Sequence, residues 1–246
     1  MIWKITSSKP TKAAKPEGFT LNGHAVEVIR SPRARRMRLA VDPRSGRVKL
    51  TLPKRTALRD GVQWAGEQSD WISRESAKLP QAQPIVPGMM ICIGGDIVRL
   101  DWAEHYSRIP KRVGDTLCVG GALSELSPRT LRWLKREALR LLDAETREIG
   151  ARAGVSIGKV GIGDPVSRWG SCTSTGDIRY SWRLILMPAD VRRATVAHEV
   201  AHRIHMNHGA AFHALTAEIY GADPKPAQLW LKAHGAALHW FGRAVA

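Results

Sequence analysis

Alternating apolar and polar side chains predict β-strands in the first quarter of the chain. The segments MRLAV and VKLTL are apolar at every second position, which is typical of a strand with one buried face. The residues DPRSG between them favour a hairpin turn, and the proline after VKLTL should end the pairing because it lacks a backbone N–H. The predicted strands are 25–30, 36–42 and 47–52.

A helical pattern follows and leads into a second group of strands. It continues to about residue 78, and its candidate core residues are Val62, Trp64, Ala65, Trp71 and Ile72. Three prolines between residues 80 and 87 mark an extended connector. Beyond it, the pattern predicts a hairpin around the turn residues GGD and then a short strand, over residues 90–93, 97–102 and 116–119.

The second half of the chain is predicted to contain a long helix, a small sheet and three further helices. Ser127 and Pro128 favour a helix start, as N-cap and first residue, and the helix should reach about residue 150. A turn at 173–177 separates the last two of three strands, predicted over 159–162, 166–171 and 178–186. The closing helices are predicted from Asp190 to about His205 and over 210–220 and 226–238.

This order of elements predicts an α+β fold with three regions. The chain has 246 residues, of which 43% are apolar and 24% charged, so it excludes a collagen, a low-complexity chain and a fully disordered one. We expect a flexible basic tail at 1–23, a strand-rich N-terminal region at 24–125, and a helix–sheet–helix region at 126–246.

Positive charge is concentrated near the N-terminus. The formal net charge is +16, and residues 1–60 contain 15 basic and 4 acidic side chains. Such a region either attracts nucleic acid or another polyanion, or is a solvated basic face, and the sequence leaves both interpretations open. The basic residues that crowd the predicted strands and turns are Arg33, Arg35, Arg36, Arg38, Arg44, Arg47 and Lys49.

Several locations and classes of protein are not expected. No apolar stretch approaches the length of a membrane span, and the first residues lack the apolar run of a secretory signal. Three scattered cysteines are too few for a disulfide framework or a CxxC zinc site. We therefore expect a cytoplasmic protein that does not associate with membranes.

The sequence HEVAH at 198–202 supplies candidate chemistry. Positions four apart on a helix share one face and lie about 6 Å apart along the axis, so His198 and His202 can bind one tetrahedral Zn²⁺. Glu199 then lies beside the open coordination position, where it can accept a proton from the water that the metal activates.

A third ligand is needed, and several residues are available. His208 is the preferred candidate, because the helix can end at Asn207 and turn the chain back, helped by Gly209. His205 lies about 10.5 Å from His198 along a continuous helix, which is too far for a tetrahedron. Glu218 on the next helix is an alternative ligand, and His213 is expected to pack or face solvent.

Three motifs together carry a resemblance to a known family. They are RWGSC at 168–172, WRLILMP at 182–188, and HEVAH followed by NHGAAF at 207–212. Over residues 24–235 the chain resembles the YgjP-like bacterial zinc metallopeptidases, which are allied to the SprT-like and WLM zincins. The resemblance implies a minimal zincin core, zinc ligands His198, His202 and His208, and Glu199 as catalytic base.

The residues around the candidate metal ligands differ in part from those of similar sequences. Gly209 and His213 stand where similar sequences usually have serine and an aromatic residue. In zincins an edge strand near the metal pairs with an extended substrate. Here either 166–171 or 178–186 could be that strand. The alternative is that these two segments form an interior hairpin that packs Trp169 and Trp182 under the helix. Cys172 is expected to be a small buried residue rather than a nucleophile.

These residues favour a zinc-dependent hydrolase, in the first place a metallopeptidase acting on polypeptides. Zinc chemistry does not dictate the bond that is attacked, so a zinc-dependent nucleotide phosphohydrolase is an alternative. A nucleic-acid-associated module that works through the basic N-terminal region is a third, and it can coexist with protease activity.

Overall fold

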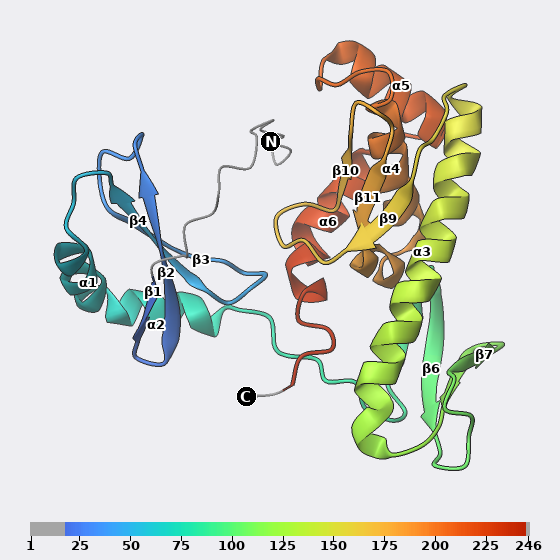
Figure 1. The fold of residues 1–246 in the computed structure, drawn as a ribbon, viewed down its shortest axis with the longest axis horizontal. Helices are drawn as coiled ribbons and strands as arrows, with labels where there is room; N and C mark the ends of the chain where they lie inside the picture. Colours follow the sequence, from blue (N-terminus) through green and yellow to red (C-terminus); the bar gives the residue numbers. More distant parts are fainter. Residues whose placement is uncertain (1–17, 245–246) are drawn as a thin grey trace. The chain divides into compact units, whose positions relative to one another are not determined.

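A computed structural model describes residues 18–244, and these residues form two compact units. The chain divides between Leu79 and Pro80, and each unit has its own apolar core. Helices and mixed sheets occur in both (Figure 1), so the predicted α+β class is confirmed. Residues 1–17, most of the expected tail, lie outside the described part of the chain.

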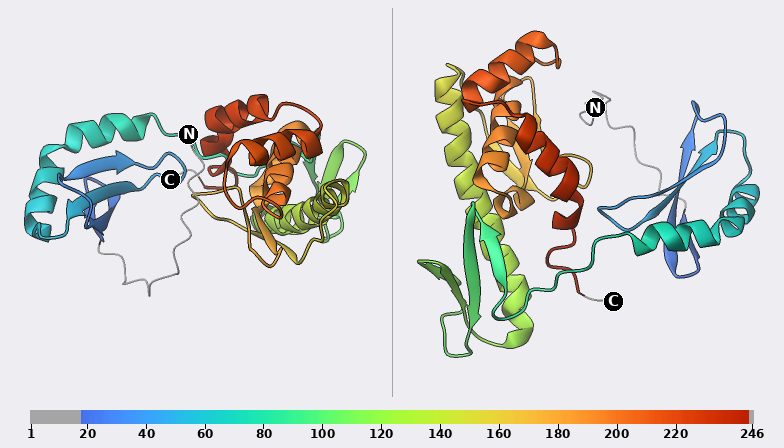
Figure 2. Two further views of the ribbon diagram at one scale, coloured as in Figure 1. Left: turned by 90° about the horizontal axis from the view of Figure 1, so that it is seen from above. Right: turned by 180° about the vertical axis from the view of Figure 1, so that it is seen from behind.

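The N-terminal unit is a four-stranded sheet with two helices on one face (Figure 2). The strand order is β1-β2-β4-β3, in which β2 and β4 are parallel and the other pairs are antiparallel. The strands are β1 (Gly18–Leu21), β2 (His24–Ser31), β3 (Arg38–Val41) and β4 (Val48–Pro53), and the helices are α1 (Leu58–Glu67) and α2 (Ser69–Ala77).

The predicted strands of this unit are found, with differences at the ends. Residues 18–21 form β1, although the expected tail included them. Pro53 is the last paired residue of β4, since a proline at the end of a strand loses little of the ladder. The expected single helix is two helices, and Ala65 and Ile72 pack their inner faces against Val26, Val28, Val48, Leu50 and Leu52.

The C-terminal unit begins with a second four-stranded sheet, of order β5-β6-β8-β7. Gly94 and Gly95 both have positive φ, as the tight turn of the predicted hairpin requires. Strand β7 was not predicted, because its three residues, KRV, carry no periodic apolar pattern. The strands are β5 (Met90–Ile93), β6 (Asp96–Trp102), β7 (Lys111–Val113) and β8 (Thr116–Val119).

Helix α3 (Leu126–Arg152) runs alongside both sheets of this unit (Figures 1 and 2). A short 3₁₀ helix, η1 (Leu123–Glu125), precedes it, so Ser127 lies inside the first turn and is not the N-cap that the sequence predicts. The buried face of α3 includes Leu134, Ala138 and Leu142, and it joins the apolar faces of both sheets in one core. That shared core places β5–β8 in the C-terminal unit, whereas the sequence-based division grouped residues up to 125 with the N-terminal region.

The third sheet has the order β10-β11-β9, with β11 (Ile178–Ser181) in the centre. The prediction of a strand over 178–186 is wrong in its second half, where residues 182–186 form the 3₁₀ helix η2 (Trp182–Leu186). All five residues of η2 are buried, so the alternation in their sequence does not reflect alternating exposure. The outer strands, β9 (Val160–Gly163) and β10 (Gly170–Cys172), are short as well.

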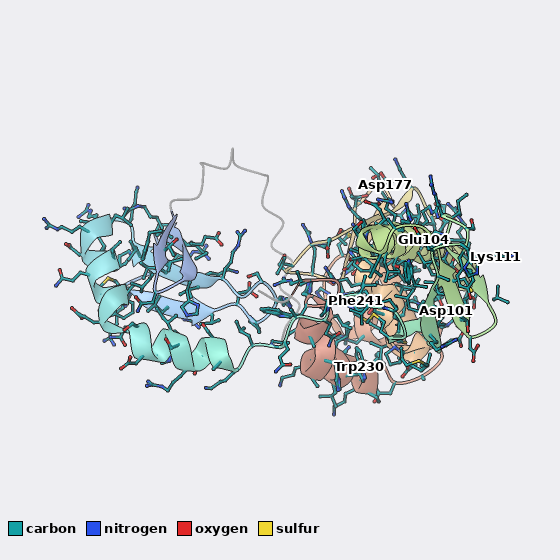
Figure 3. All side chains as sticks on the ribbon, turned by 90° about the horizontal axis from the view of Figure 1, so that it is seen from below. Asp101, Glu104, Lys111, Asp177, Trp230 and Phe241 are labelled. Carbon is teal, nitrogen blue, oxygen red and sulfur yellow. The ribbon has the colours of Figure 1, made fainter. Side chains whose placement is uncertain are left out.

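Three helices complete the unit: α4 (Ala189–Ala201), α5 (Ala210–Tyr220) and α6 (Lys225–Leu238). Pro188 is the N-cap of α4, and Asp190 lies in its first turn. Beyond α6, Phe241 forms an isolated parallel bridge with Gln83. Figure 3 labels Phe241 in the C-terminal unit. No helix between Gly18 and Ala244 is both long and apolar enough to cross a membrane.

A buried ion pair joins α3 to α4 and supplies a first prediction. Arg192 donates two hydrogen bonds to Glu145, of 2.9 and 2.8 Å, and both side chains are almost fully buried. Glu145→Gln should lower the free energy of unfolding by about 3–5 kcal/mol, because it leaves the Arg192 charge buried without its counter-charge. Chemical denaturation followed by circular dichroism measures the change.

The exposed pair of Asp143 and Arg147 on the same helix is the matched control. Asp143→Asn should cost less than about 1 kcal/mol, because solvent screens this pair. Equal losses of stability in Glu145→Gln and Asp143→Asn would contradict the importance of the buried pair.

Candidate metal centre

Three histidine rings meet at the end of α4. The Nε2 atoms of His198 and His208 are 3.2 Å apart, and the candidate ligand atoms of His198, His202 and His208 all lie within 4.8 Å of one another. Among residues 18–244, no other group of three or more histidine, cysteine or acidic side chains is placed to hold a metal ion. Two nitrogens that share a tetrahedral zinc are about 3.3 Å apart, and the distance between His198 and His208 matches this value.

The chain brings His208 to this position by a different path from the expected one. Helix α4 ends at Ala201, not near Asn207, and three tight hydrogen bonds to residues 200 and 201 close its last turn. Neither Asn207 nor Gly209 has positive φ, so a left-handed residue does not make the return. The turns at 202–204 redirect the backbone instead, and His208 follows after an irregular segment.

The hydrogen bond of His202 orients its ring for a metal. Its Nδ1 lies 3.0 Å from the carbonyl oxygen of His205, and a carbonyl can only accept, so Nδ1 carries the proton. In the neutral ring Nε2 then keeps its lone pair, and this buried atom has no hydrogen-bond partner in the structure. A metal would satisfy it, which is the observation that makes the three histidines fit a cation.

Burial also keeps the three rings neutral. Burial, together with the neighbouring rings of His202 and His208, lowers the pKa of His198 to about 2. The pKa values of His202 and His208 are lowered too, with burial as the largest cause. Neutral imidazole is the form that binds a metal, so no proton has to be displaced at neutral pH.

Glu199 lies next to the histidines and against strand β10. Its side chain is 1% exposed, and its Oε2 is buried without a hydrogen-bond partner. Burial raises the pKa of Glu199 to about 8, while the positive charge of Arg168 lowers it. The carboxyl group is therefore held in a low-dielectric position whose proton affinity a nearby cation would reduce.

Gly170 makes the position of Glu199 possible. A Cβ added at Gly170 would lie 2.5 Å from Oε1 of Glu199 and 2.6 Å from its Cγ, so a larger residue cannot share this space. The glycine within RWGSC thus permits close approach of β10 and α4. The sequence analysis predicts no role for Gly170 beyond its place in the motif RWGSC.

Phe212 forms the packing surface beneath the histidines. Its ring centroid lies 4.8 Å from that of His198, 4.7 Å from that of His202 and 4.6 Å from that of His208. The side chain is buried on the inner face of α5. Sequence reasoning missed this role, although an aromatic residue four positions after His208 is a usable signal.

The other candidates lie outside the histidine group. His205 contributes its backbone carbonyl, Glu218 is exposed on α5, and the exposed His213 ring lies 6.4 Å from that of His208. Cys172 is half-buried, and burial together with the Glu199 charge raises the pKa of its thiol to about 11. A thiol with this pKa is almost entirely protonated at neutral pH, which argues against a nucleophilic role.

A sequence profile decides the family. The profile described as YgjP-like, metallopeptidase domain, matches residues 35–234, which is most of the chain. The chain belongs to the YgjP-like family. This match confirms the resemblance carried by the three motifs, and it supports a metallopeptidase in general. No curated protein and no solved structure matches the chain.

The close approach of Gly170 to Glu199 in this YgjP-like protein can be tested by adding one methyl group at Gly170. Gly170→Ala should destabilise the fold by about 1–3 kcal/mol, because the whole Glu199 side chain must move within a packed interior. Thermal unfolding measures the effect.

Gly161 on strand β9 of the same sheet is the matched control, since an added Cβ there would meet nothing within 4 Å. Gly161→Ala should leave the melting temperature nearly unchanged. Similar shifts in Gly170→Ala and Gly161→Ala would show that the space beside Glu199 is not tight.

Proposed function

We propose that this protein is a zinc metallopeptidase in which His198, His202 and His208 hold the metal and Glu199 is the general base. The observation that carries the proposal is the pair of buried, unpartnered atoms, Nε2 of His202 and Oε2 of Glu199, at one site. Unpartnered buried polar atoms are costly, so their coincidence favours a missing cation and a water molecule as their partners. The family match supports the same class of reaction.

Zinc, when bound, polarises the scissile carbonyl and makes an adjacent water molecule acidic enough to attack it near neutral pH. Glu199 takes the proton of the attacking water and passes it to the amine that leaves. The three histidines would supply neutral nitrogen donors, which suit zinc. The carbonyl of His205 fixes the ring of His202 in the required tautomer.

Strand β10 is the candidate for holding an extended substrate. It lies at the edge of its sheet, whereas β11 pairs on both sides, so of the two expected segments only the one that contains β10 has a free edge. Trp169 O accepts a hydrogen bond from Ser181 N, and Thr173 N donates one to Asp177 O. By the alternation of an antiparallel ladder, Gly170 and Cys172 therefore direct their backbone groups to the free edge.

A polypeptide that adds to this edge would lie beside Glu199, because Gly170 contacts that side chain. Backbone pairing recognises any extended chain, which favours unfolded segments over a defined sequence. The three cysteines are free thiols in the structure, which is compatible with the cytoplasmic location that we propose.

The first test of the mechanism removes the base and keeps the shape. Glu199→Gln should retain zinc and reduce hydrolysis of an unfolded polypeptide by about 10²–10⁴-fold, which is the scale of general-base loss. Metal analysis and cleavage of unfolded protein, with and without a chelator, provide the measurements.

Asp190→Asn makes the same chemical change in the first turn of the same helix and should leave the activity intact. Near-native turnover in zinc-loaded Glu199→Gln would contradict the mechanism. Chelator-sensitive hydrolysis of nucleotides without cleavage of polypeptide would point to a phosphohydrolase instead.

The second test separates the candidate ligands by metal analysis of folded variants. His208→Ala should lose zinc, because three protein ligands fall to two. His205→Ala should retain it, since His205 acts through its backbone carbonyl, and Glu218→Ala should retain it because Glu218 lies outside the histidine group. Loss of zinc from either of these two variants, with retention in His208→Ala, would overturn the proposed ligand set.

A further inference from the structure

The N-terminal unit carries its positive charge mainly at one end of its sheet. Between residues 18 and 79 there are 13 basic and 6 acidic side chains. Eight of the basic residues belong to the end of β2, the β2–β3 connection, the start of β3, the β4–α1 connection and the start of α1. We call them the arginine cluster: Arg30, Arg33, Arg35, Arg36, Arg38, Lys54, Arg55 and Arg59.

The strand register brings these segments together. Strands β2 and β4 are parallel and pair to their last residues, Ser31 with Pro53, so the connections that follow them leave the same end of the sheet. Strand β3 starts at that end too, with Arg38 opposite Thr51. Arg30 at the end of β2 also donates a 2.8 Å hydrogen bond to the carbonyl of Thr56, which ties this strand end to the β4–α1 connection. Residues distant in sequence thus form one surface.

Carboxylates are scarce at this end. Asp60, which pairs with Arg59, is the one acidic residue of these segments. Across the described chain, Arg33, Arg35, Arg36, Arg38, Lys54 and Arg55 form no ion pair, and all six are exposed. The remaining acidic residues belong to other segments, and Asp42 and Glu75 are already paired with Lys49 and Lys78. Within the described chain no carboxylate offsets the mutual repulsion of these six side chains, which favours an anionic ligand.

We propose that the arginine cluster is a binding surface for the phosphodiester backbone of nucleic acid. Seven of its eight members are arginines, whose planar guanidinium groups match phosphate oxygens with two parallel hydrogen bonds. Three adjacent strands and their connections span roughly 10 Å before side chains are counted, so successive phosphates of one strand can be engaged together. Backbone recognition of this kind requires no particular base sequence.

The observations favour nucleic acid over an anionic membrane surface. Proteins that bind the membrane interface combine basic residues with apolar side chains that enter the lipid. Among the large apolar residues of these segments, Met37 is half-buried and Ile29 and Leu58 are only 37% exposed, while the arginines around them are exposed. The surface therefore offers charge and hydrogen-bond donors, with little to insert.

The experiment measures binding of labelled single-stranded DNA, double-stranded DNA and single-stranded RNA to the full-length protein. The affinity should fall steeply between about 50 and 200 mM salt, because released counterions gain less entropy in a saltier solution. The variant R33Q/R35Q/R36Q/R55Q should bind at least about tenfold more weakly at low salt, and its salt dependence should be smaller by about three counterions.

A matched control changes four exposed arginines of α3 in R132Q/R136Q/R140Q/R147Q. Each variant lowers the net charge of +16 by four, so the control should bind as the native protein does if the cluster is the site. Equal binding of DNA and RNA would show that the protein contacts only the phosphodiester backbone. A preference for RNA would show that it also contacts the 2′-hydroxyl groups, and both results support the proposal. Glu199→Gln should bind normally, which separates this surface from the proposed catalysis.

Three results would overturn the proposal. One is no binding by the native protein even at low salt. Another is equal weakening in the cluster variant and the α3 control, which would show an effect of net charge alone. The third is binding to vesicles that contain anionic lipid without binding to any nucleic acid, which would assign the surface to membranes. Melting temperatures of both variants establish that they are folded.

Discussion

The structure of the C-terminal unit depends on holding an ionisable carboxyl group and two imidazoles inside an apolar core, with a third, half-buried imidazole beside them. Glu199 and the helical pair His198 and His202 are each exposed by 5% or less. Polar groups at this depth are stable only if partners or a ligand satisfy them. Nearly every residue from Thr195 to Ala201 is therefore covered, by the small sheet on one side and by α3, α5 and α6 on others.

Arginine side chains tie the covering elements to one another. Arg192 and Arg193 link α4 to Glu145 and Glu148 of α3, and Arg152 at the end of α3 donates a 2.7 Å hydrogen bond to the carbonyl of Ile219 in α5. Arg183 pairs with Asp164 and also donates to the carbonyl oxygens of Leu238, at the end of α6, and of Phe241 beyond it. These contacts fix backbone positions far apart in sequence, which a preorganised site needs.

Much of this could be predicted from sequence, and the errors have physical causes. The hairpins at DPRSG and GGD were found because glycine and aspartate specify turns locally. The start of η2 and the end of α4 were not predicted, because Ser181 accepts a hydrogen bond from the Arg183 N–H and backbone hydrogen bonds to residues 200 and 201 turn the chain after α4. Periodicity does not register such contacts, so Leu186 and His205 were assigned to elements that end earlier.

In the candidate site too, local spacing could be predicted from the sequence and contacts between elements could not. The spacing of His198, Glu199 and His202 is a property of one helix turn, and sequence alone suffices to group them. His208 was predicted as a ligand from the resemblance and from an expected left-handed turn near Asn207. The structure does not have that turn, but His208 does lie with the other two histidines. Gly170 acts through a contact between β10 and α4, which no local pattern encodes.

The shortness of β10 has a consequence for behaviour at high protein concentration. An unpaired strand edge is a template on which a second molecule can assemble, and long, flat edges promote aggregation. Only three residues form this edge, and one is a glycine with no side chain to pack. Such an edge can pair briefly with a passing chain but is too short to support a continuous intermolecular sheet, so the protein can keep it uncovered without polymerising.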